Sequence, residues 1–276
     1  MTNLTSIAIN IEKRDGLYFS KNEADVSYPE HGNDFCFQIE DNSFWFQHRN
    51  NCIIEAVKNF KPDGLFFDIG GGNGFVAKGL ENAGIRCVLV EPGISGAVNA
   101  RKRGIENVIC STLEDAGFQE NSLSAVGLFD VVEHIEDDLT FLTSVHTIVK
   151  PGGHVFITVP AYGWLWSDED KYAGHFRRYT LDSLTKPLEK AGFQMAYQTY
   201  IFSILPIPIL LFRSIPGRIG YGKDPNDMDN KIQEHSPLKG LAGKVVNKFY
   251  KLELKRLQHK RKIPFGGSCL VVGKKL

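Results

Sequence analysis

A glycine-rich segment in the first third of the chain has the residue types of a cofactor-binding turn. It runs from Asp68 to Gly74 and reads Asp-Ile-Gly-Gly-Gly-Asn-Gly, directly after a short apolar run. Glycine has no Cβ and tolerates positive φ, so Gly70, Gly72 and Gly74 let backbone N–H groups approach a ligand closely. Glu91 follows about twenty residues later, where a carboxylate at the end of a second strand can bind ribose hydroxyls. This spacing predicts a site for a nucleotide-like cofactor.

Two cofactors suit that turn, and the glycines alone do not choose between them. Gly72 and Gly74 with Ala77 satisfy the G-x-G-x-x-A pattern of dinucleotide sites, which keeps an NAD(P)-dependent oxidoreductase open as an alternative. Asp68 favours the other cofactor, because a carboxylate there repels a pyrophosphate but accepts hydrogen bonds from the cationic amino-acid end of S-adenosylmethionine. A dehydrogenase-type Tyr-x-x-x-Lys pair is not found in a suitable place. The residues therefore favour S-adenosylmethionine.

The elements that position these residues alternate between strand and helix. From Asn42 or Ser43, either of which is a fair N-cap, apolar residues recur near helical spacing as far as residue 60. Apolar runs separated by helical segments then predict a parallel sheet. The expected strands are 65–67, 87–90, 108–110, 124–129, 154–159, 193–201 and 268–272, and the expected helices are 44–60, 96–103, 137–149 and one between Thr180 and Gly192.

Composition and charge exclude several other classes of protein. With 42% hydrophobic and 23% charged residues, the chain has the composition of a globular protein. Its 32 basic and 32 acidic residues balance, so no overall charge favours nucleic acid as a partner. The five cysteines lack C-x-x-C spacing, which favours reduced thiols and predicts no metal site. No signal-peptide core is visible and the apolar stretch 200–212 is too short to span a bilayer, so we expect a cytoplasmic protein.

Four segments, taken in order, resemble the motifs of one enzyme family. Residues 67–74 are similar to the first motif of the class I S-adenosylmethionine-dependent methyltransferases, and residues 90–92, Val-Glu-Pro, to their second. Residues 129–137, Phe-Asp-Val-Val-Glu-His-Ile-Glu-Asp, resemble the D-V-x-E-H-x-x-D segment of the branch that contains the ubiquinone-biosynthesis O-methyltransferase. Residues 150–154 resemble the family's turn after the fourth strand.

The resemblance covers residues 63–201 and the last strand, 266–273, and it implies an α/β fold. The expected architecture is a Rossmann-like, mostly parallel sheet of seven strands in the order 3-2-1-4-5-7-6, with helices on both faces. An N-terminal helical cover would occupy 1–60, and the S-adenosylmethionine-binding domain 61–202 and 265–276. An insert over 203–264 would shape the acceptor site.

The resemblance also implies contacts to the cofactor, residue by residue. Asp68 and the glycines would hold the methionyl part, Glu91 the ribose, and Phe129 the sulfonium side. The adenine segment, 110–115, departs from the family's common G-D-A pattern. Arg49, on the N-terminal helix, could face the cofactor carboxylate, with simple packing of that helix as the alternative. The predicted cofactor residues are thus Asp68, Gly70, Gly72, Gly74, Glu91, Phe129 and Arg49.

Methyl transfer is an in-line displacement at carbon, so the protein mainly aligns the reactants and excludes water. For a hydroxyl acceptor, a positioned base adds roughly 10²- to 10⁴-fold, and His134 is the candidate, with hydrogen bonding inside its loop as the alternative. An aromatic and basic rim follows the fifth strand, at the sheet edge where ligands bind. Its candidate substrate residues are His175, Arg177, Arg178 and Tyr162, with ion pairs to the acidic residues at 168–170 as the alternative role for the arginines.

The insert over 203–264 does not continue the alternation of strands and helices. Its segment 237–262 holds nine Lys or Arg residues against the single Glu253, and apolar residues at spacings of three and four predict a basic amphipathic helix. The predicted apolar stripe is Leu238, Leu241, Val245, Phe249 and Leu252. Such a helix could rest on an anionic membrane surface near a lipid-like acceptor, or could pack its stripe on the domain.

Together these features predict methyl transfer from S-adenosylmethionine to a small-molecule or lipid-linked acceptor, most readily at oxygen. The enzyme would be cytoplasmic, with peripheral membrane contact through 203–262 as an option. A protein at the membrane surface that binds the cofactor without catalysis is the second alternative, beside the oxidoreductase.

Overall fold

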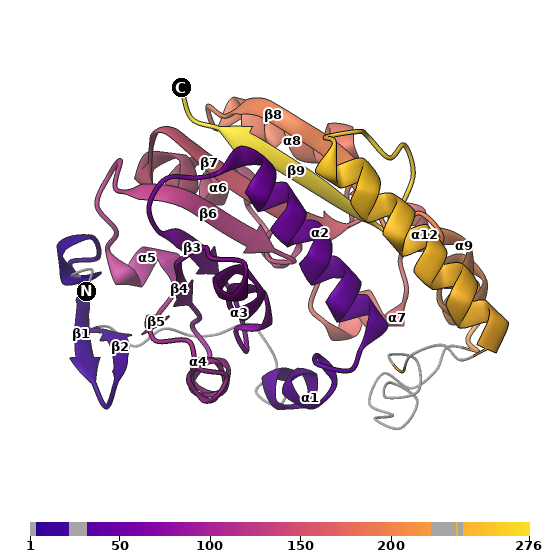
Figure 1. The fold of residues 1–276 in the computed structure, drawn as a ribbon, viewed down its shortest axis with the longest axis horizontal. Helices are drawn as coiled ribbons and strands as arrows, with labels where there is room; N and C mark the ends of the chain where they lie inside the picture. The colour runs from indigo at the N-terminus through magenta and orange to yellow at the C-terminus, as the bar shows by residue number, and fades with distance from the viewer. Residues whose placement is uncertain (1–3, 22–31, 222–235, 237–239) are drawn as a thin grey trace.

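The computed structural model describes residues 4–21, 32–221, 236 and 240–276. Within them, nine strands form one mixed sheet in the order β1-β2-β5-β4-β3-β6-β7-β9-β8 (Figure 1). The strands are β1 Ile11–Arg14, β2 Leu17–Ser20, β3 Phe66–Ile69, β4 Cys87–Val90, β5 Val108–Cys110, β6 Leu123–Phe129, β7 Val149–Pro160, β8 Gln194–Ile201 and β9 Ser268–Lys274. The helical elements are η1 Leu4–Ser6, α1 Gly32–Ile39, α2 Phe44–Phe60, α3 Phe75–Asn82, α4 Ile94–Lys102, α5 Leu113–Ala116, η2 Val132–His134, α6 Asp138–Ile148, η3 Gly163–Leu165, α7 Asp168–Tyr172, α8 Leu181–Lys190, α9 Pro206–Ile209, η4 Leu210–Ser214, α10 Ile215–Arg218 and α12 Gly240–Gln258.

The strands β3 to β9 confirm the predicted Rossmann-like order 3-2-1-4-5-7-6. β3 lies between β4 and β6 and is parallel to both, whereas β9 is antiparallel to β7 and β8. The central strands β3 and β4 are buried throughout, because helices cover both faces of the sheet (Figure 1). This arrangement brings the carboxyl ends of β3, β4 and β6 to one edge, where the predicted site residues lie.

The predicted count of seven strands is corrected to nine. The two extra strands, β1 and β2, form a hairpin that adds to the β5 edge, with β2 parallel to β5. Asp15 and Gly16 form its two-residue turn, and both have positive φ (48° and 82°). An Asp-Gly pair is a strong short-range hairpin signal that the strand prediction did not use.

The predicted helix over 44–60 is confirmed as α2. Ser43 is its N-cap, and the side chain of Ser43 accepts a hydrogen bond from the backbone N–H of Phe46. α2 runs across one face of the sheet beside α3 and α12 (Figure 1). It therefore lies between α3, which follows the glycine turn, and the insert helix α12.

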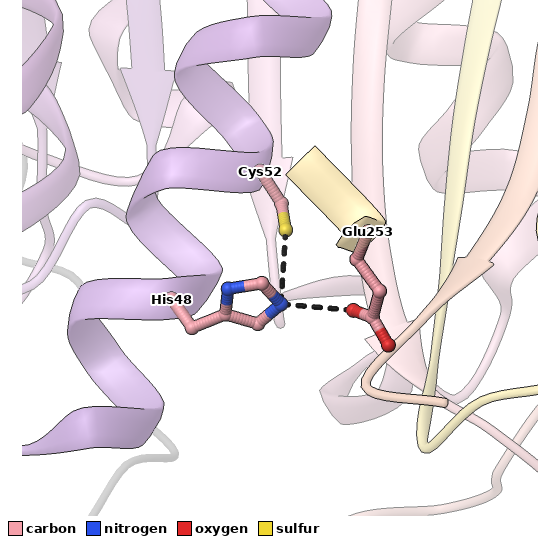
Figure 2. A group of neighbouring side chains, drawn as sticks. All are labelled: His48, Cys52 and Glu253. Atoms are coloured by element: carbon pink, nitrogen blue, oxygen red, sulfur yellow. Dashed lines mark hydrogen bonds and ion pairs between the residues drawn. The ribbon is translucent and has the colours of Figure 1, made fainter. Parts of the chain in front are cut away.

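The insert helix α12 is attached to α2 through a buried polar contact. Figure 2 shows His48 and Cys52 of α2 facing Glu253 of α12, with His48 Nε2 2.8 Å from a Glu253 carboxylate oxygen. Glu253 also accepts hydrogen bonds from the backbone N–H groups of Phe202 and Ser203. The lone acidic residue of the basic segment thus points inward, and it fixes which face of α12 is buried.

The predicted basic helix exists, but its predicted apolar stripe is not the buried face. Val245, Phe249 and Leu252 are exposed, whereas Tyr250 and Leu257 are buried beside Glu253. Leu238 lies outside the described residues, as does the side chain of Leu241. The alternative in which this stripe packs on the domain is therefore wrong for the three exposed residues. No helix in the described part of the chain is long and apolar enough to cross a membrane.

Candidate active site

The glycine-rich turn connects β3 to α3, as the sequence predicts. Gly70, Gly72 and Gly74 have φ values of 68°, 51° and 76°, which favour glycine. A Cβ on Gly70 would also lie 2.7 Å from a methyl group of Val131. The turn therefore needs glycine at Gly70 for two reasons, backbone conformation and space.

Asp68, at the end of β3, is a buried carboxylate that lacks a partner. It is 1% exposed, and neither carboxylate oxygen has a hydrogen-bond partner. Burial raises the pKa of Asp68 to about 7, although the Arg49 guanidinium opposes this increase. An orphaned carboxylate in the cavity wall fits a ligand that brings a positive charge, such as the ammonium group of S-adenosylmethionine.

Glu91 lies at the end of β4 and reaches the glycine turn. Its two carboxylate oxygens accept hydrogen bonds from the backbone N–H groups of Gly72 and Gly93, each at 2.9 Å. Burial raises the pKa of Glu91, and these hydrogen bonds oppose the increase. The contacts hold Glu91 at the position from which the sequence predicts ribose binding.

One cavity of about 910 Å³ extends from the glycine turn to the insert. The end beside the glycine turn includes Phe129, the last residue of β6, and residues 111–114, which belong to the segment predicted to contact adenine. The opposite end is lined by residues 133–135, by the region around His175, and by the start of the insert. The cavity is therefore large enough to bring a cofactor and an acceptor together.

The N-terminal helices cover the end of the cavity beside the glycine turn. α1 and α2 both contribute to its wall, including Trp45 and Arg49. Arg49 forms an ion pair with Asp130, with 2.7 Å between Nε and the carboxylate, and donates a hydrogen bond to the Phe129 carbonyl. Arg49 thus reaches the cavity as predicted, and its predicted contact to the cofactor carboxylate stays a prediction.

Glu133, His134 and His175 meet at the end of the cavity opposite the glycine turn. Each offers one ligand atom, and these atoms lie within 4.8 Å of one another. Burial, and then the neighbouring His175, lower the pKa of His134 to about 4, so its imidazole is neutral at pH 7. Burial, with Asp130 nearby, raises the pKa of Glu133. This group could accept a proton or hold a divalent cation, a site type that the sequence analysis did not predict.

Glu133 is the functional candidate that the sequence analysis missed. It is fully buried, and neither of its carboxylate oxygens has a hydrogen-bond partner. The signal was present, because Glu133 directly precedes His134 in the matched motif. What the sequence did not reveal was that its side chain is buried at the cavity wall without a partner.

The four predicted substrate residues separate into two pairs. His175 and Arg178 line the cavity, and both contact the buried Asp170 carboxylate, at 2.9 and 2.7 Å. Burial alone would raise the pKa of Asp170, but the hydrogen bonds from His175 and Arg178, the charge of Arg178 and the backbone N–H of Ser167 together outweigh it and hold the pKa at about 2. Arg177 instead pairs with Asp138, and Tyr162 stacks among other aromatic rings, so neither lines the cavity.

Comparisons with known proteins agree with this geometry. A family described as a methyltransferase domain matches residues 47–198, which is more than half of the chain. The chain belongs to the class I S-adenosylmethionine-dependent methyltransferases. This methyltransferase therefore uses S-adenosylmethionine, and the oxidoreductase alternative is set aside.

Curated relatives match only part of this methyltransferase. A ubiquinone biosynthesis O-methyltransferase of Vibrio parahaemolyticus is 31% identical over 120 residues, which is 40% of this chain and 49% of the relative. A protein of the same name from Pectobacterium carotovorum is 26% identical over 121 residues. The chain thus spans about half the length of the curated relatives it matches.

Solved structures confirm the fold of the methyltransferase. A Haemonchus contortus phosphoethanolamine N-methyltransferase in complex with S-adenosyl-L-methionine superposes with a TM-score of 0.57 at 18% identity, over 94% of this chain and 61% of that chain. A Thermotoga maritima methyltransferase, described as a possible histamine N-methyltransferase, gives 0.53 at 20% identity, over 88% and 97%. At these identities the likeness establishes the fold alone.

Proposed function

We propose that this protein transfers the methyl group of S-adenosylmethionine to a hydroxyl group of a small or lipid-linked acceptor. The observation that carries the proposal is the group of proton-accepting side chains, Glu133, His134 and His175, at the acceptor end of the cavity. A hydroxyl is a weak nucleophile until its proton is taken, whereas a neutral amine attacks without losing one first. The ubiquinone biosynthesis O-methyltransferase relatives support the same choice.

Each part of the cavity has a task in this reaction. When bound, S-adenosylmethionine would supply an electrophilic methyl group for in-line transfer to the acceptor oxygen, with S-adenosylhomocysteine as the product. Asp68 would anchor the methionyl part of the cofactor and Glu91 its ribose, and α1 and α2 would exclude water from it. His134 takes the hydroxyl proton, either directly or together with Glu133.

The wall contributed by the insert supports an acceptor with an apolar part. Leu205, Pro208, Ile209 and Phe212 line the cavity on the side of the insert. A polar ring or head at Glu133 and His134, with an apolar tail along these residues, would match both parts of the wall. An isoprenoid quinone precursor has this chemistry.

The test is a transfer assay that measures S-adenosylhomocysteine formation with matched acceptors. An alkylcatechol, catechol without the chain, and an alkylamine of equal chain length separate oxygen from nitrogen and tail from no tail. We expect turnover with the alkylcatechol, weaker turnover with catechol and none with the amine. Preference for the amine would contradict the proposal, and cofactor binding without turnover on any acceptor would support the non-catalytic alternative.

Variants then test the proton acceptor. His134→Gln should lower kcat by about 10²- to 10⁴-fold and leave the affinity for S-adenosylhomocysteine unchanged. His146→Gln is the matched control, because His146 packs on Phe193 and does not line the cavity. Loss of activity in EDTA, restored by a divalent cation, would assign the group to cation binding instead of proton transfer.

A further inference from the structure

Exposed apolar side chains are concentrated on the insert. Among the described residues, eighteen large apolar side chains are exposed, and nine of them lie in 206–221 and 240–258. The most exposed include Ile207 at 63%, Phe212 at 69% and Ile219 at 64%. A concentration of this kind on a protein surface marks an interaction site.

The exposed face of α12 follows from the way its opposite face is attached. Glu253 and Tyr250 both point toward α2. Glu253 contacts His48 there (Figure 2), and the ring of Tyr250 stacks on His48 with 3.7 Å between the ring centroids. Because successive helical residues turn by about 100°, Val245, Phe249 and Leu252 form a strip along one flank of this buried face. They are 43% to 50% exposed.

Positive charge follows this strip along the outer side of α12. Lys244, Lys248, Lys251 and Lys255 are all exposed, and the spacing of three and four puts them on one face. Glu253, the only acidic residue in 240–262, is buried. An apolar strip bordered by lysines, with no exposed acid in the helix, complements a surface that is apolar inside and anionic at its rim.

The second exposed segment is continuous with the cavity. Ile209 and Phe212 line the cavity, while Ile207, Leu211 and Ile219 of the same short stretch face outward. The residues directly before α9 also contact α12, since the backbone N–H of Ser203 donates to Glu253. The stretch from α9 to α10 is thus one wall of the acceptor cavity and part of the outer surface.

We propose that the surface formed by the outward side chains of 206–221 and by the exposed strip and lysines of α12 docks on an anionic lipid bilayer. The apolar side chains insert among the acyl chains near the headgroups, and the four lysines contact anionic headgroups. Docking in this orientation places the insert side of the cavity against the lipid. This inference does not depend on the acceptor atom, because it concerns where the protein binds and not what it methylates.

The experiment is co-sedimentation of the full chain with two kinds of vesicle, phosphatidylcholine alone and phosphatidylcholine with about a third phosphatidylglycerol. We expect binding to the anionic vesicles, weakened by salt, and little binding to the neutral ones. Replacing Lys244, Lys248 and Lys251 by Gln should lower the partition coefficient by about 100-fold, from about 5-fold per lysine. Ile207→Ser with Leu211→Ser and Ile219→Ser should abolish binding to the vesicles, because it removes apolar side chains that would insert into the bilayer. None of the three lines the cavity, so these substitutions should not affect the cofactor site.

Matched variants keep the test specific. Ile9→Ser with Leu139→Ser removes exposed apolar side chains elsewhere, and Lys186→Gln with Lys190→Gln removes exposed charges elsewhere. Both should bind vesicles like the parent, and every variant should retain its affinity for S-adenosylhomocysteine, which shows that it folds. If the matched variants lost as much vesicle binding as the variants of the proposed surface, or if the parent did not bind anionic vesicles, the proposal would be overturned. A dimer that the Ile207, Leu211 and Ile219 substitutions dissociate would assign the surface to a second copy of the chain and overturn it too.

Discussion

Cofactor affinity should depend on pH through Asp68, because this carboxylate is buried without a partner until a cation arrives. Its pKa in the protein alone is raised to about 7 by burial. The ammonium group of the cofactor needs the ionised carboxylate, so Asp68 must lose its proton before or during binding. The affinity should therefore rise with pH up to this pKa and become constant above it.

The magnitude follows from the fraction of Asp68 that is protonated. With a pKa of about 7, the carboxylate is about 90% protonated at pH 6 and about 10% at pH 8. S-adenosylhomocysteine should then bind about tenfold more tightly at pH 8 than at pH 6, a difference of about 1.4 kcal/mol. Binding should release about 0.9 proton at pH 6 and about 0.1 at pH 8.

Isothermal titration calorimetry at both pH values, in two buffers with different ionisation enthalpies, measures the affinity and the proton release together. Asp68→Asn has the same shape but no charge, so it should bind about 10- to 100-fold more weakly at pH 8 and with no dependence on pH in this range. An affinity in the parent that does not change between pH 6 and pH 8, or the same pH dependence in Asp68→Asn, would refute the reasoning.

Three further predictions concern particular residues. Gly70→Ala should abolish binding of S-adenosylhomocysteine in calorimetry, because the added Cβ would collide with the side chain of Val131. Gly84 has a similar φ but open space around it, so Gly84→Ala should lower the unfolding free energy by only about 1 kcal/mol. Glu253→Ala should lower the unfolding free energy in urea titrations by about 3–5 kcal/mol, because it removes the carboxylate that His48 contacts and leaves two buried backbone N–H groups unpaired. Glu55→Ala removes only a partly exposed pair to Lys58 and should cost less than about 0.5 kcal/mol. Glu133→Leu should raise the unfolding free energy by about 1–2 kcal/mol in the same titrations, because it removes a buried carboxylate without a hydrogen-bond partner. The same variant should stop methyl transfer, and unchanged activity would exclude a role for Glu133 in the reaction.

Much of the fold could be predicted from the chain because its signals are local. The strand and helix alternation, the glycine turn at residues 70–74 and the N-cap at Ser43 depend on neighbouring residues, and the structure has them where expected. The hairpin at residues 11–20 was missed, since each strand is only four residues long and its partner β5 lies about ninety residues away. Short strands gain their stability from non-local pairing, which leaves little periodicity in the sequence.

The sequence by itself determined that a turn requiring glycine follows the Asp68 carboxylate at the end of a buried strand, because residue type and backbone conformation are local properties of consecutive residues. Only the tertiary structure decided which residues line the opposite end of the cavity, the proposed acceptor side. In the structure, Arg177 pairs with Asp138 away from the cavity. Glu133 and His175, which follow two different strands, lie close together. Glu253 is buried against His48, which leaves the Val245 flank of α12 exposed. The physical reason is that burial and ion pairing depend on which distant segments meet, and spacing along the chain does not encode that meeting.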